Sequence, residues 1–143
     1  MRIADVLRGK GSAVATIEEH STVSALLGAL AEHNVGALVV VDGNGGLAGI
    51  VSERDVVRRL HEHGADVLSG PVSAIMTSTV YTCAPEDSVD TLTVQMTERR
   101  IRHVPVLRDG ALVGIVSIGD VVKSRISQLE EHGERLQAYI AQG

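Results

Sequence analysis

Apolar and polar residues follow two different periods along this chain, and each period predicts a different kind of element. Between residues 22 and 33, and again between 88 and 100, apolar residues stand three, four or seven positions apart, as on one face of a helix. Each helical segment is followed by two short runs that are apolar at nearly every position, which is typical of strands covered on both faces of a sheet. The runs span 37–41 and 47–51 in one half, and 104–107 and 112–116 in the other.

The order of these elements repeats within the chain. The stretch GIVSERDVV of the first half returns as GIVSIGDVV in the second half, about 65 residues later. A short β segment precedes each helix, at 13–17 and 79–83, and a second helix begins at Ser52 or Ser117. Each half therefore reads β-α-β-β-α.

We predict from this an α+β protein of the α/β type, in which two β-α-β-β-α repeats pack as a pseudo-twofold pair. A lone unit of about 60 residues buries too little apolar surface to be stable, so the two halves are expected to share an interface. Residues 1–64 form the first repeat, and 65–125 form the second, with 65–71 as a linker. Residues 126–143 form a C-terminal helical extension.

The C-terminal helix carries its own apolar pattern. Its apolar residues have the spacing of a heptad repeat, with Gly133 in the missing position. The residues of this stripe are Val122, Ile126, Leu129, Leu136 and Ile140. The helix is expected either to pack on the two repeats or to pair with a second copy of the chain.

Composition narrows the classes of function. The chain has no Trp or Phe and a net charge of −5, which argues against a nucleic-acid partner. Its single cysteine, Cys83, cannot form an internal disulfide and is expected to be a buried small hydrophobe. No signal peptide and no apolar run of about 18 residues is seen, so we expect a cytoplasmic location and no membrane partner.

The chain shows no pattern of an active site or a metal site. The histidines have no spacing that converges on an acid, and no nucleophile–base pair is visible. We therefore predict no catalytic residues, no metal and no required cofactor.

The most informative motif is Ser-x-x-Asp, which stands twice at a predicted strand-to-helix corner. The pairs are Ser52 with Asp55 and Ser117 with Asp120. One interpretation is a capping box, in which serine and aspartate satisfy each other's backbone N–H groups. The other is a ligand site, because a helix N-terminus favours phosphate and a carboxylate there can accept both hydroxyls of a ribose. The two roles can alternate.

In this motif and in two further stretches, the chain resembles a pair of cystathionine β-synthase (CBS) domains, from about Ile3 to Arg125. The resemblance rests on the paired motif, on RHVPV at 102–106 and on the lead-in VSAIMT at 72–77. Such tandem modules occur in enzymes, channels and stand-alone sensors that respond to adenine nucleotides. They commonly form homodimers, so the resemblance favours a homodimer here.

The resemblance also implies a cleft with two nucleotide sites. In such modules the aspartate of the motif binds the ribose with the serine nearby, which carries over to Asp55 with Ser52 and to Asp120 with Ser117. The resemblance implies Ile17 and Val80 at the adenine. It implies Arg102 and His103 at the phosphate.

The two halves differ at these positions, so we predict unequal sites. The first half has Gly36 where the second has Arg102, and therefore lacks that phosphate partner. The first motif carries Arg54, which can bind phosphate through two donors, whereas the second has Gly119, which allows a ligand close to the backbone.

The leading hypothesis is a regulatory, energy-sensing module rather than an enzyme. Its regulatory ligand would be an adenosine-type molecule of the AMP, ADP, ATP, NAD or S-adenosylmethionine class, and ligand-linked shape change would act on an unidentified protein. The alternative is a ligand-free structural module that binds proteins through a dimer surface and the C-terminal helix.

Overall fold

The computed structural model describes residues 1–11 and 13–142. Ser12 of the predicted first repeat and Gly143 of the predicted extension lie outside the described residues. The first half contains α1 (Ile3–Lys10), β1 (Thr16–Glu18), α2 (Val23–His33), β2 (Ala37–Val41), β3 (Leu47–Ser52) and α3 (Glu53–His63). The 3₁₀ turns η1 (Ala65–Ser69) and η2 (Val72–Ala74) then lead to α4 (Val89–Arg99), β4 (His103–Arg108), β5 (Ala111–Ser117) and α5 (Ile118–Gln142). The predicted α+β class is confirmed.

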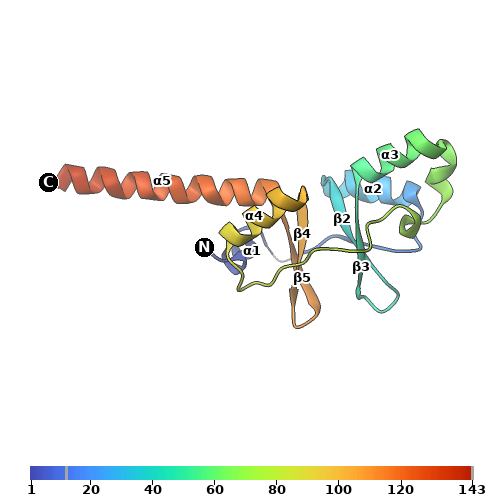
Figure 1. Ribbon diagram of the computed structural model, residues 1–143, viewed down its shortest axis with the longest axis horizontal. Coiled ribbons are helices and arrows are strands. Elements are labelled where there is room, and N and C mark those ends of the chain that lie inside the picture. The colour runs from blue at the N-terminus through green and yellow to red at the C-terminus, as the bar shows by residue number, and fades with distance from the viewer. Residues whose placement is uncertain (12, 143) are drawn as a thin grey trace.

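Two antiparallel hairpins form the centre of the molecule. In the first half, β2 pairs antiparallel with β3, and β1 adds to β2 in parallel. In the second half, β4 and β5 form a two-stranded sheet. The hairpins stand side by side with their turns at the same end, so their opposite ends, where the strands meet α3 and α5, also lie together (Figure 1).

The predicted strand at 79–83 is wrong, because this segment makes only one isolated bridge, between Cys83 and Val106. Cys83 exchanges two backbone hydrogen bonds with β4, of 3.1 and 2.9 Å. The next bond of a parallel ladder would run from the N–H of residue 105 to the carbonyl of Tyr81. Residue 105 is proline and has no N–H, so the ladder stops there. Val39 holds the corresponding place in the first half and pairs with Thr16 of β1.

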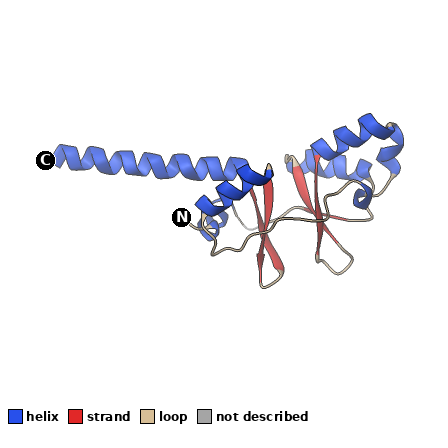
Figure 2. Cartoon of the chain, in the orientation of Figure 1, coloured by secondary structure: helices blue, strands red, loops and turns tan. Residues whose placement is uncertain are grey.

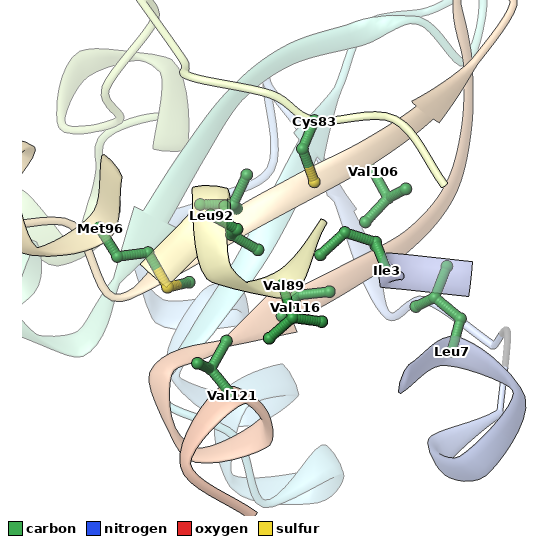
Figure 3. Packing of buried hydrophobic residues seen from close by; sticks show 10 residues of the cluster. Ile3, Leu7, Cys83, Val89, Leu92, Met96, Val106, Val116 and Val121 are labelled. Carbon is green, nitrogen blue, oxygen red and sulfur yellow. The ribbon is translucent and has the colours of Figure 1, made fainter. Parts of the chain in front are cut away.

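Each half has its own core, and each core includes a segment that precedes the other half in sequence. Ile3 and Leu7 of α1 pack into the core of the second half, against Val89, Val116 and their neighbours (Figure 3). Val72 and Ile75, which precede the second half, pack into the core of the first. The sequence boundary of the first repeat therefore does not coincide with the boundary of its core.

The glycine of each GIVS stretch lies beneath one of these crossing segments. A Cβ atom on Gly49 would come within 2.6 Å of the carbonyl oxygen of Thr77 and 2.9 Å of Sδ of Met76. That carbonyl is fixed, because Thr77 and Ile50 exchange two backbone hydrogen bonds of 2.9 and 3.0 Å. At the equivalent Gly114, a Cβ atom would lie 2.6 Å from a terminal methyl of Leu7.

We expect the variant Gly49→Ala to lose roughly 1–3 kcal/mol of unfolding free energy, because a fixed backbone oxygen occupies the place of the new methyl group. The matched variant Gly114→Ala should lose less, since the end of Leu7 can move aside. Urea unfolding of both variants measures the difference. An equal or smaller loss in Gly49→Ala would contradict the close approach.

The helix α5 begins on the body and then leaves it. Val121 and Ser124 are buried near its start, whereas its C-terminal part projects away from the two hairpins (Figure 2). The predicted helix at the C-terminus is therefore confirmed, as one 25-residue helix continuous with the second repeat. Among residues 1–11 and 13–142, no helix combines the length and the apolar character that crossing a membrane requires.

Candidate functional site

Both Ser-x-x-Asp motifs form capping boxes at their strand–helix corners. The amide of Ser52 donates to Oδ2 of Asp55 at 2.8 Å, and the amide of Asp55 donates to Oγ of Ser52 at 3.3 Å. The second corner repeats this with Ser117 and Asp120, at 2.9 and 3.1 Å. The capping interpretation is thus correct for both motifs. In both boxes the serine amide donates to Oδ2 of the aspartate, so the surroundings of each carboxylate decide what else it can bind.

The corner of Asp55 opens into a cavity of about 400 Å³ between the two halves. The start of α3 lines one side of it, and the segment from Arg100 to His103, which joins α4 to β4, lines the other. All hydrogen bonds that the Asp55 carboxylate accepts from the described residues use Oδ2. The structure therefore brings together Ser52, Arg54 and Asp55 of the first half with Arg102 and His103 of the second. The expectation that the first site lacks Arg102 does not hold for this cavity, because the segment before β4 reaches it from the other half.

Four arginines line this cavity, together with the acidic residues Glu53 and Asp55. Arg54 and Arg58 stand four residues apart on α3 and so share one face of the helix. Arg100 and Arg102 contribute from the second half. Arg58 and Arg100 were not among the predicted site residues. The four-residue spacing of Arg58 from Arg54 does indicate that both lie on one face of the helix.

The backbone of Arg100 adopts the left-handed conformation at the end of α4, with φ 55° and ψ 43°. Asn34 occupies the equivalent position at the end of α2 with nearly the same angles. This conformation is unusual for a long side chain and is tolerated far better by asparagine. Arg100, which lines the cavity, therefore occupies a left-handed position that asparagine would adopt at a lower conformational cost.

The corner of Asp120 is occupied by the chain itself. Nζ of Lys10, at the end of α1, lies 2.6 Å from Oδ2 of Asp120 and donates at 2.9 Å to the carbonyl of Ile115. Burial alone would raise the pKa of Asp120, but the hydrogen bond from Lys10 and those from Ser117 lower this pKa overall. A smaller cavity of about 230 Å³ remains beside this ion pair, between α1 and α5.

No local signal in the sequence points to Lys10, because its partner Asp120 lies 110 residues away. Two predicted residues of this corner, Ser117 and Gly119, line neither the larger nor the smaller cavity. The two corners differ, because Asp55 borders an open cavity whereas Asp120 is paired with an ammonium group.

His103 lies between the two corners. Its pKa is lowered by burial first and then by the charges of Lys10 and Arg102, whereas Asp120 and Glu53 act in the opposite direction. The imidazole is therefore uncharged at neutral pH, since the ordinary value is 6.5. Its role toward a ligand would be that of a neutral hydrogen-bonding group rather than of a cation.

The two residues expected at the adenine lie elsewhere. Ile17 is 8% exposed and belongs to the core of the first half, where it pairs with Val40. Val80 is half-buried in the segment before Cys83. Neither lines the cavity at Asp55.

One group of potential metal ligands exists within the described part of the chain, formed by Glu18, Glu19 and His20. Local contacts already use these groups, because Glu18 accepts from the amide of His20 at 2.9 Å and the imidazole lies 3.3 Å from Glu19. The His20 side chain is 74% exposed. We assign no metal to it.

These features define a class of protein: two pseudo-symmetric α+β repeats, each with a capped strand–helix corner, one of which opens into a cavity between the halves. The sequence model of the CBS domain matches the chain twice, over residues 10–62 and 72–127. The chain belongs to the CBS domain family.

Relatives and solved structures agree with this assignment. A mitochondrial CBS domain-containing protein of Arabidopsis thaliana is 39% identical over 151 residues, which cover 99% of this chain and 72% of that protein. The crystal structure of a CBS-domain containing protein from Agrobacterium tumefaciens has 42% identity and a TM-score of 0.84, over 87% of this chain and 92% of that one.

A third structure was solved with ligands. It is a CBS domain pair in complex with 5′-methylthioadenosine and S-adenosyl-L-methionine, with 26% identity and a TM-score of 0.80, covering 90% of this chain and 98% of that one. CBS domain pairs are ligand-binding regulatory modules.

Proposed function

We propose that this chain is a regulatory module that binds one phosphorylated adenosine nucleotide in the cavity at Asp55. The observation that carries the proposal is the composition of that cavity, which is lined by four arginines together with Glu53 and with Asp55 at a helix N-terminus. The carboxylate suits the two hydroxyls of a ribose, and the guanidinium groups suit phosphate oxygens. A volume of about 400 Å³ lies within the range of small-molecule sites.

The charges favour some members of the predicted ligand class over others. AMP, ADP, ATP and NAD carry phosphates, whereas S-adenosylmethionine carries a sulfonium cation that four guanidinium groups would repel. S-Adenosylmethionine is bound by the related domain pair described above. For this chain we propose that affinity rises with the number of phosphates.

The arginines of α3 allow a direct test. In the double variant Arg54→Gln, Arg58→Gln, we expect ATP to bind at least roughly tenfold more weakly, because charged hydrogen bonds of about 1.5–3 kcal/mol each are lost. Adenosine should bind the variant as it binds the wild type. Isothermal titration of both ligands measures this.

Arg59→Gln is the matched control, because Arg59 lies on the same helix but contacts Glu62 at 3.3 Å and lines no part of this cavity. Equal losses for ATP and adenosine in the double variant, or an equal loss of ATP binding in Arg59→Gln, would contradict the phosphate assignment.

The proposal includes a ligand-linked change of shape that acts on another protein. Because the cavity is lined by both halves, a ligand there would fix their relative tilt. We propose a regulatory rather than an enzymatic role, a homodimeric assembly and a cytoplasmic location. The curated Arabidopsis relative is named as mitochondrial, so location needs its own measurement in cells.

A thermal-shift screen tests the proposal as a whole. Binding to the folded form alone raises stability by about 2.7 kcal/mol at a ligand concentration a hundredfold above Kd. We expect a clear upward shift of Tm with ATP or ADP on protein stripped of ligands. No shift with any of AMP, ADP, ATP, NAD or S-adenosylmethionine would favour the alternative, a ligand-free module that acts through protein contacts.

A further inference from the structure

Along its outer part, α5 carries an apolar stripe that is uncovered by the described residues of the chain. Ile126 and Leu136 are each 50% exposed, Leu129 is 60% exposed and Ile140 is 74% exposed. Steps of four and three alternate along the stripe, with Gly133 in the one position that lacks a large side chain. Contiguous exposed apolar surface of this kind marks an interaction site.

The body of the molecule does not occupy this face. The buried positions near the start of α5 are Val121, which packs into the core with Ile3 of α1 and Leu92 of α4, and Ser124; they are 3% and 9% exposed. At roughly 100° per residue, these positions point in a direction well away from that of Ile126 and Leu129. The helix then projects beyond the hairpins (Figure 1), and the large apolar residues of the stripe from Ile126 onward are all at least 50% exposed.

We propose that α5 pairs with α5 of a second copy of this chain, as a parallel, in-register two-stranded coiled coil. In heptad terms, Val122, Leu129 and Leu136 stand at d, and Ile126, Gly133 and Ile140 at a. This proposal does not depend on a bound nucleotide.

The charges beside the stripe select the second copy and its direction. Arg125 stands at g and Glu130 at the following e, which are the positions that face each other across a parallel pair. In register, each Arg125 meets the partner's Glu130. The antiparallel arrangement that overlaps the whole stripe instead sets the two Glu130 carboxylates against each other. The present contact of Arg125, at 3.3 Å to the 82% exposed Asp90, is a weak surface pair that the dimer can replace.

Gly133 weakens the proposed pairing, so a larger side chain at this position should strengthen it. A Cβ atom added there would meet nothing within 4 Å of the isolated chain, so the position is open. In the dimer the two glycines face each other and leave a gap in the apolar seam, which weakens the association. Filling the gap by Gly133→Ile is expected to lower the dimer dissociation constant by roughly tenfold or more.

Cysteine cross-linking of the full-length chain tests orientation and register. We expect the variant Leu129→Cys to form a disulfide-linked dimer on mild oxidation, because d positions of a parallel pair lie opposite each other. The variant Glu131→Cys, on the outer face, is the control and should remain uncross-linked. The native Cys83 is buried and does not interfere.

Two further arms make the test decisive. In an antiparallel pair, residue 129 lies across from residue 133, so a mixture of Leu129→Cys and Gly133→Cys chains would then cross-link while Leu129→Cys alone would not. That pattern would overturn the parallel arrangement. A wild-type chain that sediments as a monomer at high concentration, or a Gly133→Ile variant whose association is unchanged, would overturn the pairing itself.

Discussion

Replacing Asp55 by asparagine is expected to weaken nucleotide binding by roughly 10- to 100-fold, because the charged acceptor for the ribose hydroxyls is lost. Asparagine has nearly the same shape and can still accept from the amide of Ser52, so the cap of α3 is largely retained. Isothermal titration with ATP gives the affinity, and urea unfolding shows that the fold is intact.

The matched variant is Asp120→Asn. Because Lys10 already holds Asp120, this change is expected to leave the affinity at the first site within about a factor of two. If Asp120→Asn abolished binding and Asp55→Asn did not, the ligand would belong at the second corner, and the assignment of the open site would be wrong.

Replacing Lys10 by methionine is expected to raise the number of nucleotides bound per chain from one to two. Methionine keeps most of the apolar stem but removes the ammonium group that lies 2.6 Å from Asp120. The carboxylate of the second corner then becomes accessible to a ribose, as it is at Asp55. The stoichiometry of titration measures this directly, and the double variant Lys10→Met, Asp120→Asn should return it to one.

The Lys10→Met variant is also expected to change how the free energy of unfolding depends on pH. The pKa of Asp120 is lowered in the folded state relative to its ordinary value of 3.8. The corresponding stability is therefore present above pH 3.8 and is lost as the pH falls through the folded value. Lys10→Met removes a main cause of the lowered pKa, so the variant should be less stable than the wild type near neutral pH, with the difference shrinking in acid. Equal stability at all pH values would contradict the ion pair.

Local patterns predicted most elements of the fold. The three-four spacing placed α2 and α4, and the apolar runs placed the two hairpins, because these signals depend on near neighbours. The strand predicted at residues 79–83 was wrong because this segment was assumed to pair in the same way as its counterpart in the first half. Pro105 stands where the first half has Val39, and the missing N–H that ends the ladder follows from the residue type alone.

The candidate site was only partly predictable, for a different reason. Ser52, Arg54 and Asp55 belong to one turn of the chain, so the motif alone grouped them. Arg102 and His103 were expected to serve the second half, and only the packing of the two halves brings them to the cavity at Asp55. The pairing of Lys10 with Asp120 depends on the whole fold bringing the end of α1 against β5. No spacing along the chain encodes that contact.

The crossing of the two lead-in segments has a consequence for how the molecule comes apart. When either hydrophobic core opens, it releases a segment whose neighbours in the chain belong to the opposite half. The two repeats therefore exchange their lead-in segments and do not form cores that are independent of each other. If the chain were cut at the linker, each fragment would carry a segment that belongs to the other core and would lack the segment that completes its own.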